Sequence, residues 1–244
     1  MVILINALAN ILPINNKTTG ALSDQYPNLF VPAGITFSIW GVIYFLLLGS
    51  VIFQLFYVFK SDKEDGFVSK IGIWFLVSCL SNSLWILAWH YEKVALSLAI
   101  MLVLLFTLIQ IYERLKIGLD FSTSLGGNLW IKIPFSIYLG WISIATIANV
   151  TALLVENNLS ELGLSQSIWT QILIVIGILL ALTILFKRKD IFYGLVVVWT
   201  YYGIYLKQAN TAFEGIVKVA ILGIILISIG VFIQIFRKRT YIFQ

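Results

Sequence analysis

The stretch that says most about the fold of this chain is Pro32-Ala33-Gly34-Ile35-Thr36-Phe37-Ser38-Ile39-Trp40-Gly41-Val42-Ile43-Tyr44. Its proline and glycine mark a turn, and the apolar run that follows is long enough for a membrane helix. Within that run Phe37, Trp40 and Tyr44 recur at intervals of three and four residues, which places them on one face of a helix. The stretch therefore predicts a membrane helix with an aromatic face.

The composition of the chain is that of a membrane protein. Of its 244 residues, 60% are hydrophobic and only 11% are charged, whereas roughly 25% of the residues in a soluble domain are charged. The net charge of +5 is spread over short basic clusters between apolar runs, as in membrane loops. We therefore expect an all-α, polytopic transmembrane helical bundle whose main partner is the lipid bilayer, with no nucleic acid bound.

Seven full membrane spans are predicted, at 33–59, 67–89, 93–113, 131–155, 167–186, 190–206 and 215–236. Each is close to the roughly 20 apolar residues that a helix needs to cross a bilayer. Residues 1–12 are apolar but too short to cross, and we interpret them as the C-terminal half of one more helix. A signal peptide is the alternative, but no basic segment and no small-residue cleavage site precede Pro13.

Basic residues alternate between rich and poor loops along the chain. Twelve of the 16 Lys and Arg residues lie on the rich side, namely Lys60, Lys63, Lys70, Arg114, Lys116, Lys132, Lys187, Arg188, Lys189, Arg237, Lys238 and Arg239. The other loops carry only Lys17, Lys93, Lys207 and Lys218. Because basic loops favour the cytoplasm, we expect a cytoplasmic C-terminus, an external 13–32 loop and a bacterial plasma membrane location.

Two later spans each carry an aromatic face with an asparagine. In the 67–89 span the face is formed by Asn82, Trp85 and Trp89, and in the 131–155 span it is formed by Tyr138, Trp141, Ala145 and Asn149. A polar group without a partner in hydrocarbon costs several kcal/mol, so each asparagine needs a partner. That partner is either a ligand or a neighbouring helix to which the amide is hydrogen-bonded.

The remaining tryptophans have simpler interpretations. Trp89 and Trp130 lie near span ends, which is typical of residues at the membrane–water interface. For Trp74, Trp169 and Trp199 we identify no polar partner at helical spacing, which favours packing or lipid contact. Trp40, Trp85 and Trp141 lie deeper in their spans, and for these we favour the lining of a pocket.

The sequence offers no recognisable catalytic or metal-binding constellation. His90, at a predicted helix end, is the only histidine, so we expect no Ser-His-acid set and none of the usual protein-made zinc sites. Cys79 is the only cysteine, which excludes an intrachain disulfide. None of the spans has an acidic or basic residue at its centre, as proton relays and ion-coupled pumps usually do. We expect that the protein is not an enzyme and has no covalently bound cofactor.

The three faces, taken in order, resemble the translocator protein / tryptophan-rich sensory protein (TspO/MBR) family. The second-helix pattern of that family, P-x-G/W-x-x-F-x-x-W-x-x-x-Y, is matched by Pro32, Gly34, Phe37, Trp40 and Tyr44. Its third-helix pattern, L-x-N-x-L-W, is matched by Leu80, Asn82, Leu84 and Trp85. Its fifth-helix pattern, Y-L-x-W-x-S/A-x-A-T-x-x-N, is matched by Tyr138, Leu139, Trp141, Ser143, Ala145, Thr146 and Asn149.

This resemblance implies a TspO-like five-helix unit with a truncated first helix at 1–157, followed by a region of three further transmembrane helices at 158–244. The family binds porphyrins and, in some members, sterols, in a pocket between its helices. By resemblance, the ligand-binding residues here are Phe37, Trp40, Tyr44, Asn82, Trp85, Tyr138, Trp141, Ala145 and Asn149. A homodimer is also implied by the resemblance alone.

The function that we expect is the binding of a flat hydrophobic ligand, such as a porphyrin-type tetrapyrrole or haem, or a sterol-like lipid. The protein would act in a sensory or translocation role. A small-molecule membrane transporter or permease subunit is the alternative. One departure bears on the identity of the ligand: the fourth helix of the family often carries an acidic residue at its middle, and residues 95–100 contain none.

Overall fold

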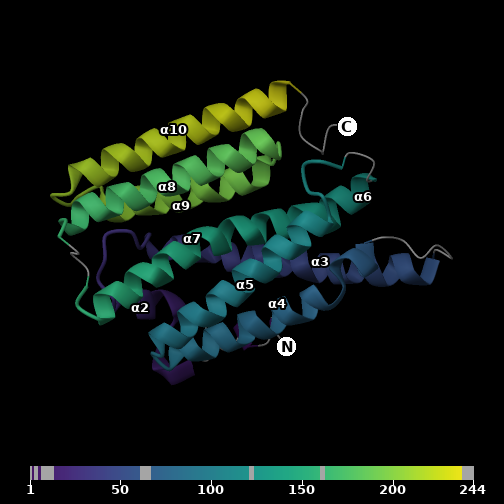
Figure 1. The fold of residues 1–244 in the computed structure, drawn as a ribbon, viewed down its shortest axis with the longest axis horizontal. Helices are drawn as coiled ribbons and strands as arrows, with labels where there is room; N and C mark the ends of the chain where they lie inside the picture. The colour runs from purple at the N-terminus through teal and green to yellow at the C-terminus, as the bar shows by residue number, and fades with distance from the viewer. Residues whose placement is uncertain are drawn as a thin grey trace.

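The computed structural model describes residues 2, 5–6, 14–60, 67–120, 124–159 and 163–237, with the backbone alone at 57–60. Every element in these ranges is a helix (Figure 1). The long helices are α3 (Ile39–Lys60), α4 (Phe67–His90), α5 (Val94–Arg114), α7 (Ile133–Glu156), α8 (Gln166–Lys187), α9 (Ile191–Gln208) and α10 (Glu214–Phe236). The short ones are η1 (Ile14–Asn16), α2 (Thr19–Asp24), η2 (Gly34–Ser38), α6 (Leu125–Gly127) and η3 (Asn128–Lys132).

The described helices confirm an all-α membrane bundle. Six of them are long and apolar enough to cross a membrane, and they correspond to six of the seven predicted spans. The remaining predicted span, 190–206, forms α9, but α9 is not among those six. Its 18 residues include several tyrosines and end with Lys207 and Gln208, which lowers its hydropathy. Instead of facing lipid all round, α9 packs against α7, α8 and α10.

The first apolar segment lies largely outside the described residues. Only Val2, Ile5 and Asn6 are described within 1–12, and all three are helical. The interpretation of this segment as half of a further helix therefore stays a prediction.

The long helices pack as two groups that meet at α7 and α9 (Figure 1). On one side α4 packs against α5, α5 against α7, and α3 against α7; on the other side α8, α9 and α10 pack against one another. Glycines allow close approach inside these contacts, as is common between membrane helices. A Cβ atom on Gly177 of α8, for example, would lie 2.2 Å from the Tyr201 hydroxyl oxygen of α9.

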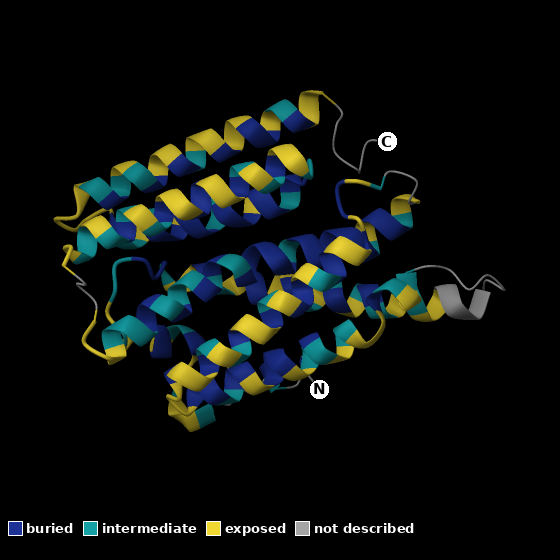
Figure 2. Cartoon of the chain, viewed as in Figure 1, coloured by how far each residue is buried: buried dark blue, intermediate teal, exposed yellow. Residues whose placement is uncertain are grey.

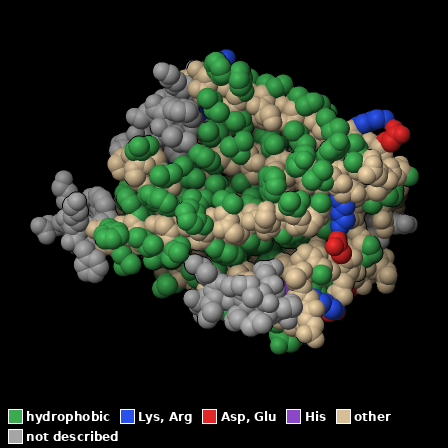
Figure 3. Space-filling model, turned by 180° about the vertical axis from the view of Figure 1, so that it is seen from behind, with side chains coloured by type: hydrophobic (Ala, Val, Ile, Leu, Met, Phe, Trp, Pro, Cys, Tyr) green, Lys and Arg blue, Asp and Glu red, His purple; other side chains and the backbone are tan. Residues whose placement is uncertain are grey.

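Buried side chains face the inside of the bundle, and large apolar side chains cover much of its outside (Figures 2 and 3). Phe45 is 66% exposed, and Leu179 is 60% exposed. A soluble monomer rarely exposes apolar surface on this scale, whereas lipid tails solvate it. Acidic and basic side chains lie together near one edge of the face in Figure 3.

Successive long helices run antiparallel, so each end of the bundle collects alternate helix ends. The short helix α2 lies at one end, together with the last residues of α4, α7 and α9 (Figure 1). We call this the α2 end. The last residues of α3, α5, α8 and α10 lie at the opposite end. The described basic residues Arg114, Lys187 and Arg237 follow or close those helices, in line with the alternation seen in the sequence.

Candidate functional site

A cavity lies toward the α2 end, between helices of both groups. Most of its wall is apolar, and it is lined by Thr19, Ser23, Phe30, Pro32, Phe37, Trp40, Trp85, Trp89, Trp141, Ile144, Ala145, Ala148, Asn149 and Thr200. Six of the nine sequence-predicted site residues are in this set: Phe37, Trp40, Trp85, Trp141, Ala145 and Asn149. The cavity offers about 40 Å³ for the centres of water molecules, which is room for roughly three waters.

Trp40 is at the centre of the aromatic wall. Its ring stacks on Tyr44 with a centroid distance of 5.4 Å and contacts Trp85 at 5.8 Å. It also meets the edge of Trp141 at 6.0 Å, and Trp141 in turn meets Phe37 at 5.9 Å. These are the offset and edge-on geometries that aromatic rings prefer. The faces predicted on three separate helices therefore come together around a single residue.

Two indole groups of the wall are buried without a hydrogen-bond partner. Trp40 is 7% exposed and Trp141 is 3% exposed, and the Nε1–H of neither finds an acceptor among the described residues. A buried donor that is left unsatisfied costs roughly 1–3 kcal/mol, and the few such groups in proteins call for an explanation. Both groups line the cavity, so an acceptor on a bound molecule is the explanation that we test below.

Asn149 is fixed in the cavity wall by its neighbours on two other helices. Its Oδ1 accepts a hydrogen bond from Trp85 Nε1 at 3.0 Å. Its Nδ2 donates to the Ser97 hydroxyl at 3.1 Å. The amide thus joins α4, α5 and α7, and the hydrogen bond from Trp85 holds that indole in the wall.

The other three predicted site residues do not line the cavity but form a polar layer beside it. Asn82 is fully buried, and its Nδ2 donates to the Tyr138 hydroxyl at 2.7 Å. Its Oδ1 accepts from Asn6 Nδ2 at 2.8 Å and from the Tyr44 hydroxyl at 3.4 Å. Asn82 and Trp85 share a helix face, but three residues separate them by about 4.5 Å along the axis, so they lie at different depths.

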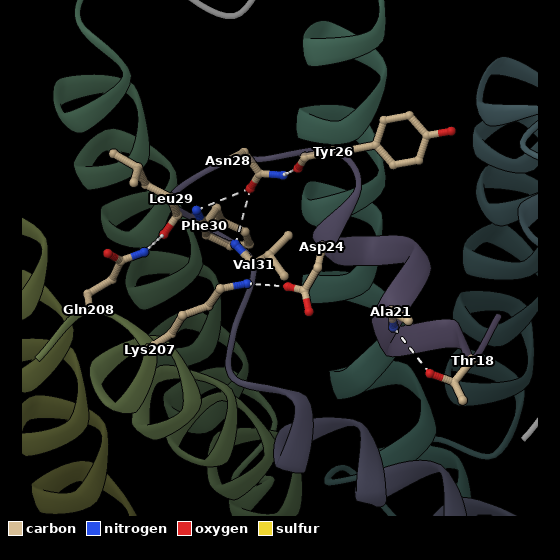
Figure 4. A network of polar contacts seen from close by, with 10 residues as sticks. All are labelled: Thr18, Ala21, Asp24, Tyr26, Asn28, Leu29, Phe30, Val31, Lys207 and Gln208. Carbon is tan, nitrogen blue, oxygen red and sulfur yellow. Dashed lines mark hydrogen bonds and ion pairs between the residues drawn. The ribbon is translucent and has the colours of Figure 1, made fainter. Parts of the chain in front are cut away.

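The first loop covers the cavity, and the sequence patterns did not point to its contribution. We call residues 14–38 the lid. Four lid residues outside the predicted set, Thr19, Ser23, Phe30 and Pro32, line the cavity. Thr19 and Ser23 lie on the short helix α2, and Phe30 and Pro32 lie in irregular chain, so no long apolar helical pattern marked any of them. Asn28 positions one of them, because its Oδ1 accepts from the backbone N–H groups of Phe30 and Val31 (Figure 4).

One side of the lid is held by the end of α4. His90 is buried, with Nδ1 3.0 Å from the Ile14 carbonyl oxygen and Nε2 3.2 Å from the Thr19 hydroxyl oxygen. Trp89 lies 5% exposed in the cavity wall and packs on Tyr26 with ring centroids 5.6 Å apart. The prediction that Trp89 lies at the membrane interface is therefore wrong for its side chain. Burial raises the pKa of the Tyr26 hydroxyl, and the negative charges of Glu156 and Glu92 raise it further.

The other side of the lid is held by α9. The Trp199 indole donates to the Thr36 carbonyl oxygen at 3.0 Å, so Trp199 has a polar partner that its own helix does not supply. The backbone N–H of Ala33 donates to the Gly203 carbonyl oxygen at 3.0 Å. Figure 4 shows the last two attachments: Lys207 pairs with Asp24 at 2.6 Å, and Gln208 Nε2 donates to the carbonyl oxygen of Leu29 at 3.2 Å.

A residue of α9 also enters the cavity wall. Thr200 lines it beside Ile144 of α7, and neither was predicted. Thr200 lies one residue after Trp199 in a helix without an asparagine-marked face, so no local signal could have found it.

The arrangement suits the binding of a flat molecule better than acid–base chemistry at the wall. Among the residues that the structure describes, no group of three or more His, Cys, Asp or Glu side chains could hold a metal ion. The lining instead combines aromatic faces, the small residues Ala145 and Ala148, and hydroxyl and indole groups. Aromatic walls with a few polar groups are typical of sites for small apolar ligands.

The fold and the cavity define a polytopic helical membrane protein with an aromatic-lined site beneath a loop. The model of the TSPO-like protein family matches residues 1–233, and the chain belongs to that family. The family resemblance seen in the sequence is thus confirmed. No match was found among the curated proteins or among the solved structures.

The family match does not stop at the expected division of the chain. It extends through α8 and α9 and into α10, which the resemblance in the sequence did not cover. The division into a 1–157 bundle and a 158–244 region stays a prediction, and the contribution of Thr200 shows that the cavity draws on both.

Proposed function

We propose that this protein binds a flat hydrophobic ligand of the tetrapyrrole class in the cavity beneath the lid, and that it does so in a sensory or translocation role. The observation that carries the proposal is the pair of unpartnered indole N–H groups of Trp40 and Trp141 within an aromatic wall. A tetrapyrrole has a large face for stacking, and its nitrogens and carboxylates can accept from indole donors. The resemblance to porphyrin-binding proteins supports the same class.

The cavity must widen before such a ligand fits. Sites for drug-sized molecules usually enclose roughly 300–1,000 Å³, far more than the space beneath the lid. We therefore propose that the structure represents a closed form. The lid is the part best suited to move, because one backbone hydrogen bond, from Ala33 to Gly203, and otherwise side-chain hydrogen bonds and ion pairs attach it to α9 and to the chain at the end of α4.

The placement in the membrane is part of the proposal. We propose that the α2 end faces outward and that the C-terminus lies in the cytoplasm of a bacterial cell. The support is the excess of basic residues at the end opposite α2 and the positive-inside rule. A homodimer stays a prediction that the resemblance alone supports.

The binding test is a titration of the full chain in lipid nanodiscs with protoporphyrin IX, followed through the Soret absorbance of the ligand. We expect saturable binding that Trp141→Phe and Trp40→Phe each weaken about fivefold, because a hydrogen bond worth roughly 1 kcal/mol is lost. The control is Trp74→Phe, since Trp74 packs edge-on against Phe106 at 5.8 Å and does not line the cavity.

Saturable binding that none of these variants weakens would place the ligand elsewhere. Absence of saturable binding by the folded wild type would exclude the tetrapyrrole class, and direct binding of cholesterol would then be measured to test a sterol-like ligand.

Transport is the second candidate function. The observation in its favour is an outer groove at the α2 end that shares Ser23 with the cavity, since a transporter needs a route from solvent to its site. Uptake of tetrapyrrole into proteoliposomes, absent from liposomes without protein, would support it. Saturable binding without uptake would leave the sensory role.

A further inference from the structure

A groove lies on the outer side of the lid and has a different chemistry from the cavity. It offers about 460 Å³ for water centres, more than ten times the space of the cavity, and both polar and charged side chains line it. The lid forms one wall through Asp24 and Asn28, and α9 forms the other through Lys207 and Gln208. Ser23 lines both the groove and the cavity, so the two spaces adjoin at the lid.

Lys207 already holds a carboxylate in this groove. Its Nζ lies 2.6 Å from Asp24 Oδ1, and the two side chains are 32% and 62% exposed. Among the described residues that line the groove, Lys207 is the one with a positively charged side chain. The next residue, Gln208, is 4% exposed and bonded to the lid backbone, which fixes the base of Lys207 at this wall. An exposed ion pair of this kind is weak, so another carboxylate can replace that of Asp24.

The position of this pair relative to the cavity suggests which carboxylate that is. Asp24 directly follows Ser23, which borders the cavity, and both belong to the last turn of α2. The groove that contains Lys207 therefore begins where Ser23 borders the cavity, on the side toward which an acidic arm of a ring held in the cavity could extend.

We propose that the outer groove is an anionic subsite, in which Lys207 binds a carboxylate of an amphipathic ring ligand in exchange for Asp24. The inference rests on the proposed function and narrows its ligand class to flat rings that carry acidic side arms. The exchange frees α2 from α9, and so loosens one attachment of the lid as the ligand enters.

The test compares an acid with its neutral ester. Protoporphyrin IX and its dimethyl ester share the ring and differ in the two carboxylates, and each is titrated into the full chain in nanodiscs of neutral lipid. We expect Lys207→Gln to weaken binding of the acid about fivefold and Asp24→Asn to tighten it about threefold, in the range of exposed ion pairs. Neither variant should change the affinity for the ester by more than about 1.5-fold.

Matched controls come from a second ion pair on the chain. Lys218 and Glu214 form an i, i+4 pair at 2.9 Å, with side chains 74% and 79% exposed, and neither lines the groove. Lys218→Gln and Glu214→Gln change the net charge in the same way and should leave both ligands unaffected. Raising the ionic strength should weaken acid binding by the wild type but not by Lys207→Gln.

The outcomes separate the two proposals. If Lys207→Gln weakens the acid and the ester equally, Lys207 only holds the lid, and the subsite is excluded while the ring site stands. If acid binding is the same in all variants, the subsite is likewise excluded. If neither ligand binds to the folded wild type, the proposed function fails and the inference fails with it.

Discussion

At the scale of single residues, the cavity wall contains two kinds of tryptophan. The indoles of Trp85 and Trp89 donate to Asn149 Oδ1 and to the Thr19 carbonyl oxygen. Those of Trp40 and Trp141 have no acceptor among the described residues. The first kind builds the wall, whereas the second leaves donors for a ligand. The same substitution should therefore have different effects at the two kinds of position.

Phenylalanine substitutions test this division. Trp141→Phe removes an unsatisfied donor and should leave the free energy of unfolding unchanged or raise it by up to about 1 kcal/mol. Trp85→Phe removes a formed hydrogen bond and should lower it by about 1 kcal/mol. The measurement is thermal unfolding of the ligand-free protein in detergent. Equal losses in both variants would contradict the division.

The polar layer beside the cavity makes a prediction about stability. Asn82→Leu deletes hydrogen bonds to Tyr138, Tyr44 and Asn6 and leaves their polar groups in an apolar interior. We expect a loss of about 1–3 kcal/mol in unfolding free energy, since such hydrogen bonds average about 0.6 kcal/mol each in membrane proteins. Asn157→Ala, at an exposed helix end, is the control and should have little effect. A neutral Asn82→Leu variant would mean that the layer does not stabilise the fold.

At the scale of elements, α9 differs from the other long helices in what it contacts. One face of its final turns meets the lid, and its first residue is preceded by the buried cap Asp190. The carboxylate of Asp190 accepts from the hydroxyls of Tyr112 and Ser136, and from two backbone N–H groups of α9. Both ends of α9 are thus tied to the other helix group.

The cap of α9 can be tested by two substitutions. Asp190→Ala removes an N-cap and leaves two hydroxyls without this acceptor, so we expect a loss of about 2–4 kcal/mol in unfolding free energy. Asp190→Asn keeps an acceptor and should lose less than half as much. Unfolding by heat in detergent measures both. If alanine and asparagine had the same effect, the hydrogen bonds of the cap would not be its stabilising feature.

The contact between the lid and α9 depends on a glycine. A Cβ on Gly203 would lie 1.9 Å from the Thr36 Oγ1 and 3.0 Å from Pro32 Cβ, so Gly203→Ala must displace the lid. We expect faster entry and faster release of protoporphyrin IX in stopped-flow experiments, by roughly tenfold or more, as one lid attachment is lost. Gly41→Ala, where a Cβ would meet no atom within 4 Å, is the control. Unchanged rates in Gly203→Ala would show that the lid does not govern entry.

At the scale of the whole molecule, the cavity belongs to both helix groups. The last three long helices pack on the rest through α7 and α9 and supply a wall residue and four lid attachments. Since membrane helices can form independently and assemble afterwards, we expect the two groups to assemble even when the chain is cut between them. The closed lid and the small cavity then follow from how the groups meet.

Expression of the chain in two pieces tests this shared cavity. Residues 1–157 and 158–244, produced together, should copurify and bind protoporphyrin IX, whereas 1–157 alone should bind at least tenfold more weakly, because it lacks the α9 wall. Gly140→Leu should prevent copurification, since a Cβ at this position of α7 already lies 3.2 Å from Val196 of α9. Full binding by 1–157 alone would assign the site to that region only.

The sequence predicted the aromatic faces of α3, α4 and α7 that meet at the cavity, but neither the contribution of α9 nor the depth of each residue. Trp85 and Asn149 were expected in the wall and lie there, as their shared aromatic pattern indicated. Asn82 fits the same pattern but lies one turn away, in the polar layer. Periodicity reports the direction in which a side chain points, and it does not report where another helix crosses. Trp89 was misjudged for the same reason, because the covering lid was not foreseen.

What the sequence determined by itself was the all-helical membrane fold and its family. In hydrocarbon every backbone polar group must be hydrogen-bonded within the protein, and an α-helix does this within its own segment, so length and hydropathy suffice to predict a helical span. The tertiary structure alone decided that α9 and the lid close the cavity and that Lys207 meets Asp24. Apolar faces toward lipid and toward protein look alike in a sequence, because lipid tails are as apolar as leucine. The packing between helices that are distant in the chain could therefore be learned only from the tertiary structure.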